Sequence, residues 1–324
     1  MGCPQSRNRP WWPTFHVEFA GAMSHRRNLR RPARSSGRQR FVKDRGQLYA
    51  WVALSGLADL AEARGDAEAA LEVTLDNPVG PDGGIFWRPW RIERLVELTE
   101  SEDPPQWVLA RWVVAQSLQH LDGNRERVMR ALEEAVLLRG GIAGLPGVDD
   151  IDAKCRVMDH DWVFRQRMVY DLGGLDHFVR RGAQQGLLAR SGDLSPWLET
   201  RLSGYVLVEQ SPSTLVWADL ADGTRQELLN LGSPAPRQVG DCVIGRAVRL
   251  AGNALFEGVP LSVPRQVASA VAAAPEEWLE RMQSGVLRHG VGSAATRKDS
   301  GRIQLLDLNL HGLTSDGPRV ASAA

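Results

Sequence analysis

Cysteine is scarce in this 324-residue sequence: Cys3, Cys155 and Cys242 lie far apart and are odd in number. Such a set argues against a disulfide scaffold and favours a reducing compartment, so we expect a cytoplasmic protein. No Cys-x-x-Cys pair occurs, which excludes the usual structural zinc knuckle. No apolar run approaches the roughly 18 residues of a membrane-spanning helix. No apolar stretch follows the first basic residues, so we expect neither a secretory signal nor a membrane partner.

Motifs of common enzyme classes are missing as well. No Gly-x-Ser-x-Gly sequence is present, which removes the usual signature of a serine hydrolase. The glycine-rich segment 140–147 lacks the Gly-Lys-Ser/Thr ending of a phosphate loop, so we interpret it as an irregular connection. We therefore predict no cofactor.

Charge is balanced overall but unevenly distributed. Residues 1–45 carry 11 basic and 2 acidic residues, whereas residues 46–285 carry 23 basic and 34 acidic residues. We expect residues 1–45 to form a disordered basic arm, because too little of it is apolar. The candidates for nucleic-acid contact are Arg26, Arg27, Arg30, Arg31 and Arg34. The acidic body suits a basic or mixed partner and disfavours DNA wrapping.

A helical pattern begins near residue 48. Apolar and small residues recur at helical spacing, Gly65-Asp66 interrupts them, and a second stretch ends near Pro78. Residues 48–78 resemble one tetratricopeptide-type helical hairpin through Trp51, Leu54, Ser55, Ala58, Ala67, Leu71 and Pro78. Further helices are predicted over 89–100, after a cap at Asp103, over 124–140, and from Asp149 or Asp150 to Leu172. We assign 46–202 to a helical domain.

The hydrophobic period switches to two at Gly204. Five strands are predicted over 205–209, 215–220, 225–231, 242–250 and 254–257. Short strands at this spacing are typical of a small barrel, which we place at 203–263, before C-terminal helices at 264–285 and a disordered tail at 286–324. The predicted fold class is α+β: a mostly helical N-terminal domain of helical hairpins, followed by a small five-stranded β-barrel-like domain.

Several motifs carry a second resemblance. They are Trp217-x-Asp219-Leu220-x-x-Gly223, Gly240-Asp241-x-Val243-Ile244-Gly245-Arg246 and Asp159-His160-Asp161-Trp162. With them the chain resembles uncharacterised actinobacterial hypothetical proteins. Residues 203–264 are also similar to a small β domain of bacterial proteins that carry a SecA-type C-terminal zinc motif. That cysteine-rich motif is absent here, so the resemblance implies a bacterial cytosolic protein but neither zinc nor an activity.

Asp152, Asp159 and His160 form the best candidate for chemistry, because carboxylates and imidazole together bind divalent metals. On one continuous helix, however, His160 would lie opposite the apolar stripe and beside arginines. The pairs Asp152/Arg156 and Asp161/Arg165 also have ordinary ion-pair spacing. We therefore favour a salt-bridged helix face over a metal or acid–base site. Only tertiary folding could bring His120 and His177 to this helix.

The segment 86–91 places tryptophans beside arginines. Trp87, Trp90 and Arg91 are candidates for a partner-binding surface, since Trp and Arg dominate binding hot spots. Core packing with arginine stacked on an aromatic rim is the favoured alternative. The sequence as a whole favours a non-catalytic interaction or adaptor protein that binds a protein partner through its helical domain. The alternatives are a metal-dependent hydrolase that uses helix 150–172, and a nucleic-acid-associated protein that uses the arm 24–45.

Overall fold

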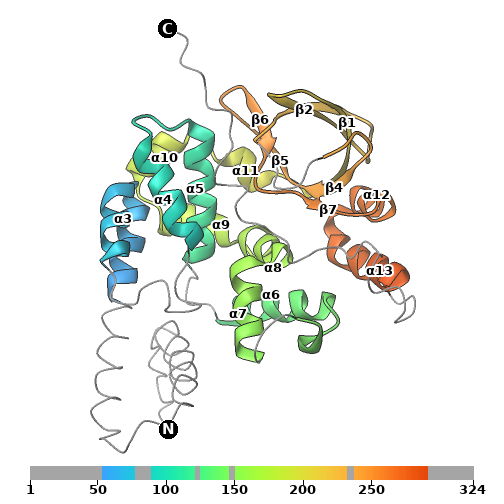
Figure 1. The fold of residues 1–324 in the computed structure, drawn as a ribbon, viewed down its shortest axis with the longest axis horizontal. Helices are drawn as coiled ribbons and strands as arrows, with labels where there is room; N and C mark the ends of the chain where they lie inside the picture. The colour runs from blue at the N-terminus through green and yellow to red at the C-terminus, as the bar shows by residue number, and fades with distance from the viewer. Residues whose placement is uncertain (1–52, 77–88, 121–124, 146–149, 232–236, 291–324) are drawn as a thin grey trace, which may run out of the picture.

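A computed structural model describes residues 53–76, 89–120, 125–145, 150–231 and 237–290 (Figure 1). The predicted arm 1–45 lies outside these ranges, and so does the predicted tail from residue 291 onward. Helices and a sheet make up the described chain, as the α+β prediction requires. Within it no helix combines the length and the apolarity needed to cross a membrane.

The chain opens with a helical hairpin, as predicted. A helix over 53–64 is joined to α3 (Ala67–Leu75) by Gly65, whose φ of 80° suits glycine, and by Asp66, which caps α3 by accepting from Ala69 N at 2.9 Å. We call these two helices the first hairpin. The next helices are α4 (Pro89–Glu100), α5 (Gln106–Gln119) and α6 (Arg125–Leu138). The predicted cap at Asp103 is wrong, because α5 begins after Pro105.

The long helix predicted from Asp149 or Asp150 to Leu172 is also wrong. The structure divides it into α7 (Asp150–His160), α8 (Trp162–Gln166) and a π-helical turn, η4 (Arg167–Asp171). Asp161 is extended at the first break, where its side chain accepts from Phe164 N at 2.7 Å and pairs with Arg139. Asp161 is therefore the cap of a new helix and not the partner of Arg165.

Three short helices then lead into the sheet: α9 (Gly174–Arg181), α10 (Gln185–Ser191) and α11 (Ser195–Glu199). The strands are β1 (Ser203–Gln210), β2 (Thr214–Asp219), β3 (Arg225–Leu229), β4 (Cys242–Gly245), β5 (Ala247–Leu250), β6 (Asn253–Phe256) and β7 (Leu261–Ser262). A five-stranded antiparallel sheet has the order β3-β2-β1-β4-β7, and β5 and β6 form a separate ribbon. The chain ends its described part with α12 (Arg265–Ala273), η5 (Pro275–Glu277) and α13 (Trp278–Gly290).

The predicted barrel is wrong, because neither sheet of the described chain closes on itself. The predicted strand 242–250 is interrupted at Arg246, whose buried side chain turns toward the helices. After this break β5 leaves the main sheet and pairs only with β6. β6 passes beside β3 without a hydrogen-bonded ladder, so the sheet stays open (Figure 1).

Both faces of the main sheet are covered. α12 packs so closely on β1 that a Cβ on Gly204 would lie 2.0 Å from the carbonyl oxygen of Ala268. On the opposite face, Tyr205, Trp217 and Phe256 pack together under the ribbon. The two larger hydrophobic clusters contain residues from both sides of position 202. The helices and the sheet therefore share their cores.

Candidate interaction site

The helix over 53–64 buries its small residues and exposes its large ones. Ala58, Ala61 and Glu62 face inward and are at most 9% exposed. Leu57 and Leu60 are 53% and 52% exposed, and they lie on one outer face because they are three positions apart. Leu57 and Leu60 belong to the apolar residues that recur at helical spacing, and that spacing alone does not show that they face outward.

Glu62 fixes this orientation. Its side chain is fully buried, and its Oε1 accepts from Arg91 Nε at 2.6 Å and from Gln119 Nε2 at 3.2 Å. Its Oε2 accepts from Trp112 Nε1 at 2.7 Å. These donors come from α4 and α5, so one carboxylate fixes the rotation of helix 53–64 against both helices. The leucines on its other side are thereby held outward.

Arg91 is held as a cation in this interior. It also donates to Asp59 Oδ1 at 2.7 Å. Burial lowers the pKa of Arg91, but the charges of Glu62 and Asp59 and their hydrogen bonds outweigh that effect and raise it above the ordinary value. The sequence analysis offered Arg91 as a partner-surface residue. The structure instead places it inside, where its side chain is 11% exposed.

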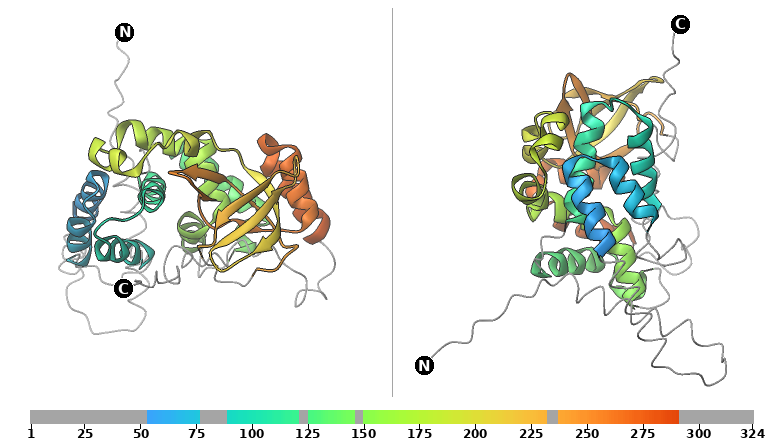
Figure 2. Two further views of the ribbon diagram at one scale, coloured as in Figure 1. Left: turned by 90° about the horizontal axis from the view of Figure 1, so that it is seen from above. Right: turned by 90° about the vertical axis from the view of Figure 1, so that its left-hand side faces the viewer.

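The outer face of α3 mixes apolar and acidic side chains. Glu68, Glu72 and Leu75 are exposed and follow one another at spacings of four and three residues. We call the exposed side chains of Leu57, Leu60, Leu75, Glu68 and Glu72 the hairpin surface. Figures 1 and 2 show the first hairpin at the end of the molecule away from α12 and α13.

Acidic side chains dominate the surroundings of the hairpin surface. α3 packs against α4. Among the described residues 53–76 and 89–105 the exposed acids are Asp66, Glu68, Glu72, Asp76, Glu97, Glu100, Glu102 and Asp103. Over the same ranges Arg64 is the one exposed base, because Arg91 and Arg94 are buried. Outside these ranges, Arg190 of α10 is an exposed base that donates to the Gly65 carbonyl at 3.3 Å. The exposed charge of these segments is still predominantly negative, and it attracts basic ligands.

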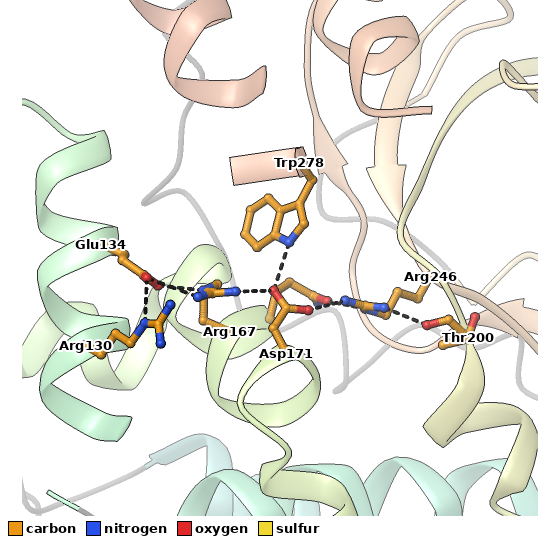
Figure 3. Close-up of polar contacts among 8 residues, drawn as sticks. Arg130, Glu134, Arg167, Asp171, Thr200, Arg246 and Trp278 are labelled. Carbon is orange, nitrogen blue, oxygen red and sulfur yellow. Dashed lines mark hydrogen bonds and ion pairs between the residues drawn. The ribbon is translucent and has the colours of Figure 1, made fainter. Parts of the chain in front are cut away.

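A second polar cluster joins the helices to the sheet (Figure 3). Glu134 on α6 accepts from Arg130 Nε at 3.2 Å and from Arg167 on η4 at 2.6 and 3.0 Å. Arg167 also donates to Asp171 Oδ2 at 2.9 Å, and Trp278 Nε1 donates to the same oxygen at 2.9 Å. Three separate segments of the chain are joined by this cluster.

Arg246 extends the cluster to the sheet. Its guanidinium donates to Asp171 Oδ1 (2.9 Å), Gln166 Oε1 (2.9 Å) and the Thr200 carbonyl (2.6 Å), and it lies 4.4 Å from the centroid of the Tyr170 ring. The side chain is 7% exposed. Each donor nitrogen has a partner, so we infer that Arg246 has a structural role and holds the sheet against the helices.

Glu257, directly after β6, completes the cluster, which we call the seam network. It is 2% exposed and accepts from Arg165 at 2.6 and 3.4 Å and from Gln166 Nε2 at 2.7 Å. Nearby, burial lowers the pKa of Arg111 to about 10, although the charge of Glu257 partly opposes this. Burial, reinforced by Glu257, raises the pKa of Tyr170 well above its ordinary value. At neutral pH Arg111 therefore stays charged and Tyr170 stays neutral.

The seam network predicts a pH dependence of stability. Burial raises the pKa of Glu134, but hydrogen bonds and charges from Arg167 and Arg130 outweigh it and lower that pKa below 4.5. A depressed carboxylate pKa stabilises the fold above the unfolded pKa, and this contribution is lost as pH falls through the folded one. We expect Glu134→Gln to lower the urea midpoint at pH 7 but to differ less and less from wild type as pH falls below about 4.5. An undiminished difference at pH 3 would contradict this.

The described residues do not form the predicted metal site. Asp152, Asp159 and His160 all lie on α7, where Asp159 is half-buried and the side chains of the other two are outside the described part. Among described side chains, no group of three His, Cys, Asp or Glu residues is placed to hold a metal ion. The structure does bring His120 and His177 together, with stacked rings whose centroids are 6.2 Å apart.

The remaining predicted residues fall outside the described chain. These are the arm residues Arg26, Arg27, Arg30, Arg31 and Arg34, together with Trp87. Trp90 is the second residue of α4, but its side chain is not described. Sequence reasoning missed the outward leucines. The available signal was Glu62 among alanines on one helical face, since a buried carboxylate implies partners on neighbouring helices.

Comparison with protein-family models, with curated proteins and with solved structures found no match to this chain. The resemblances to the tetratricopeptide hairpin, to the actinobacterial proteins and to the small β domain thus remain predictions.

Proposed function

We propose that this chain is a non-catalytic, cytoplasmic interaction protein of bacterial type, and that its hairpin surface binds a basic segment of a protein partner. The observation that carries the proposal is the outward position of Leu57 and Leu60, each more than half exposed. Burying leucine on the protein's own core is favourable, so leucines held outward by a buried Glu62 are available to a partner.

Charge supports a basic partner. The described residues 53–76 and 89–105 expose eight acids and one base, and Arg190 of α10, which donates to the Gly65 carbonyl, is a second exposed base beside the first hairpin. An apolar anchor surrounded by charge of one sign favours a segment with apolar side chains on one face and Lys or Arg on the other. The seam network supports a non-catalytic role, because its carboxylates already accept from arginines and tryptophan.

Peptide binding tests this function. The probe is a fluorescein-labelled, 18-residue helical peptide of Leu and Lys with its leucines on one face. We expect the full chain to bind it and the double variant Leu57→Ser/Leu60→Ser to bind about 30-fold more weakly. Each leucine would lose ~1 kcal/mol of apolar burial, and ~2 kcal/mol corresponds to that factor. Fluorescence anisotropy measures both affinities.

Leu137→Ser is the matched control, because Leu137 on α6 is 67% exposed but lies outside the first hairpin. It should bind the peptide as wild type does. A scrambled peptide of the same composition, without the leucine stripe, should bind weakly to all three proteins. Equal affinity of the double variant and the control variant would overturn the proposal, and so would absence of binding by wild type.

A further inference from the structure

The chain itself contains a segment with the chemistry that the hairpin surface attracts. Residues 24–45 carry nine Lys and Arg residues and one acid, Asp44. The exposed charges of residues 53–76 and 89–105 are mostly of the opposite sign, with eight acids against Arg64 and the neighbouring Arg190 of α10. Leu29, Phe41 and Val42 give the arm apolar side chains as well, and the methylene stems of its arginines can cover leucine.

The connection between the arm and the first hairpin is short, and it is long enough for the arm to reach the hairpin surface. Eight positions separate Arg45 from Ala53, the first described residue of the hairpin. Since the helical pattern begins near residue 48, residues 46–48 connect the arm to that helix and span roughly 10 Å when extended. The 22-residue arm itself spans up to roughly 73 Å when extended, whereas the described helix 53–64 is about 18 Å long. A tethered segment that reaches its site acts at an effective concentration in the millimolar range.

We propose that the arm, residues 24–45, occupies the hairpin surface of its own chain and competes there with the partner. This inference rests on the proposed function, because it uses the same surface. A second copy of the chain is a poorer occupant, since a self-complementary contact would bring the acids of one hairpin against the same acids of the other.

Zero-length carbodiimide cross-linking tests where the arm lies. The sequence has three lysines, of which Lys43 is the only one in the arm, so its cross-linked peptides are readily assigned by mass spectrometry. In the monomeric full chain at low salt we expect Lys43 to be joined to Glu68 or Glu72. Both products should disappear in Glu68→Gln/Glu72→Gln, whereas Glu126→Gln, an exposed acid on α6, should leave them unchanged. Absence of these products in wild type, or cross-linking of Lys43 only to acids elsewhere, would overturn the inference.

Competition separates this inference from the proposed function. In the arm variant, Arg26, Arg27, Arg30, Arg31 and Arg34 are all changed to serine in the full chain. We expect this variant to bind the Leu/Lys peptide at least tenfold more tightly than wild type, because the tethered competitor is removed. Equal affinities would overturn the arm as occupant while leaving the partner surface intact. If neither protein binds the peptide, the proposed function fails and the arm loses its role as competitor.

Discussion

Replacing Glu62 by alanine should cost about 3–5 kcal/mol of the free energy of unfolding, the usual cost of removing one partner of a buried ion pair. The carboxylate accepts from three buried side chains, Arg91, Trp112 and Gln119. Without it the Arg91 cation retains only Asp59 among its two acidic partners. Since domains are typically stable by about 5–15 kcal/mol, we expect a large fall of the urea midpoint for the helical part.

The first control for Glu62→Ala is Glu68→Ala, which removes the same group from the exposed face of α3 and should change stability by no more than about 0.5 kcal/mol. Urea unfolding followed by the fluorescence of the 11 tryptophans, of which Trp112 donates to Glu62, measures the unfolding of the chain. Equal midpoints for Glu62→Ala and wild type would show that the buried carboxylate does not organise the hairpin. Glu62→Gln should fall between the two, since its amide oxygen can still accept while the charge is lost.

In the first hairpin, hydrophobic periodicity predicts where the helices lie but not which of their faces is buried. Apolar spacing and the Gly65-Asp66 break predicted both helices, because these signals are local. The same spacing includes both the exposed Leu57 and Leu60 and the buried Ala58 and Ala61, and it does not distinguish between them. Which face is buried depends on Glu62 meeting Arg91, Trp112 and Gln119, residues 29 to 57 positions away. Pairings of that length leave no trace in helical periodicity.

The prediction of one continuous helix over residues 150–172 was wrong for a related reason. A continuous helix was predicted because apolar residues recur across it, yet Asp161 is used as a cap and pairs with Arg139 from another helix. An aspartate three positions before Phe164 is equally compatible with an interior ion pair and with an N-cap. The tertiary position of Arg139 decides between them. Asp152, Asp159 and His160 all precede this break, on α7, so the break changes only their relation to residues after it, such as Arg167.

The β part was predicted only in part. Four predicted strands correspond to β1, β2, β3 and β6, but the predicted strand 242–250 is divided into β4 and β5, β7 was not predicted, and the closure was wrong. Turn signals such as Asp222-Gly223 fixed where strands end, since Gly223 has a φ of 77°. The break at Arg246 was not predicted, because it is stabilised by Gln166, Asp171 and the carbonyl of Thr200, all distant in sequence. An arginine inside a strand pattern gives no sign that its side chain will be buried among helices.

Substitutions of Glu257 can measure how much the packing of the helices against the sheet contributes to the stability of the fold. We expect Glu257→Ala to cost about 3–5 kcal/mol, because Arg165 would stay half-buried without its carboxylate and Arg111 would lose the charge that opposes its low pKa. Changing both partners, in Arg165→Met/Glu257→Leu, should recover the part of this loss that comes from the unpaired Arg165 cation, but not the part that comes from Arg111 and Gln166, which also lose Glu257. The two single variants and the double variant form a cycle measured by urea unfolding. If the double variant lost the sum of the two single losses, Arg165 and Glu257 would be acting independently, and the seam network would not be what joins the helices to the sheet.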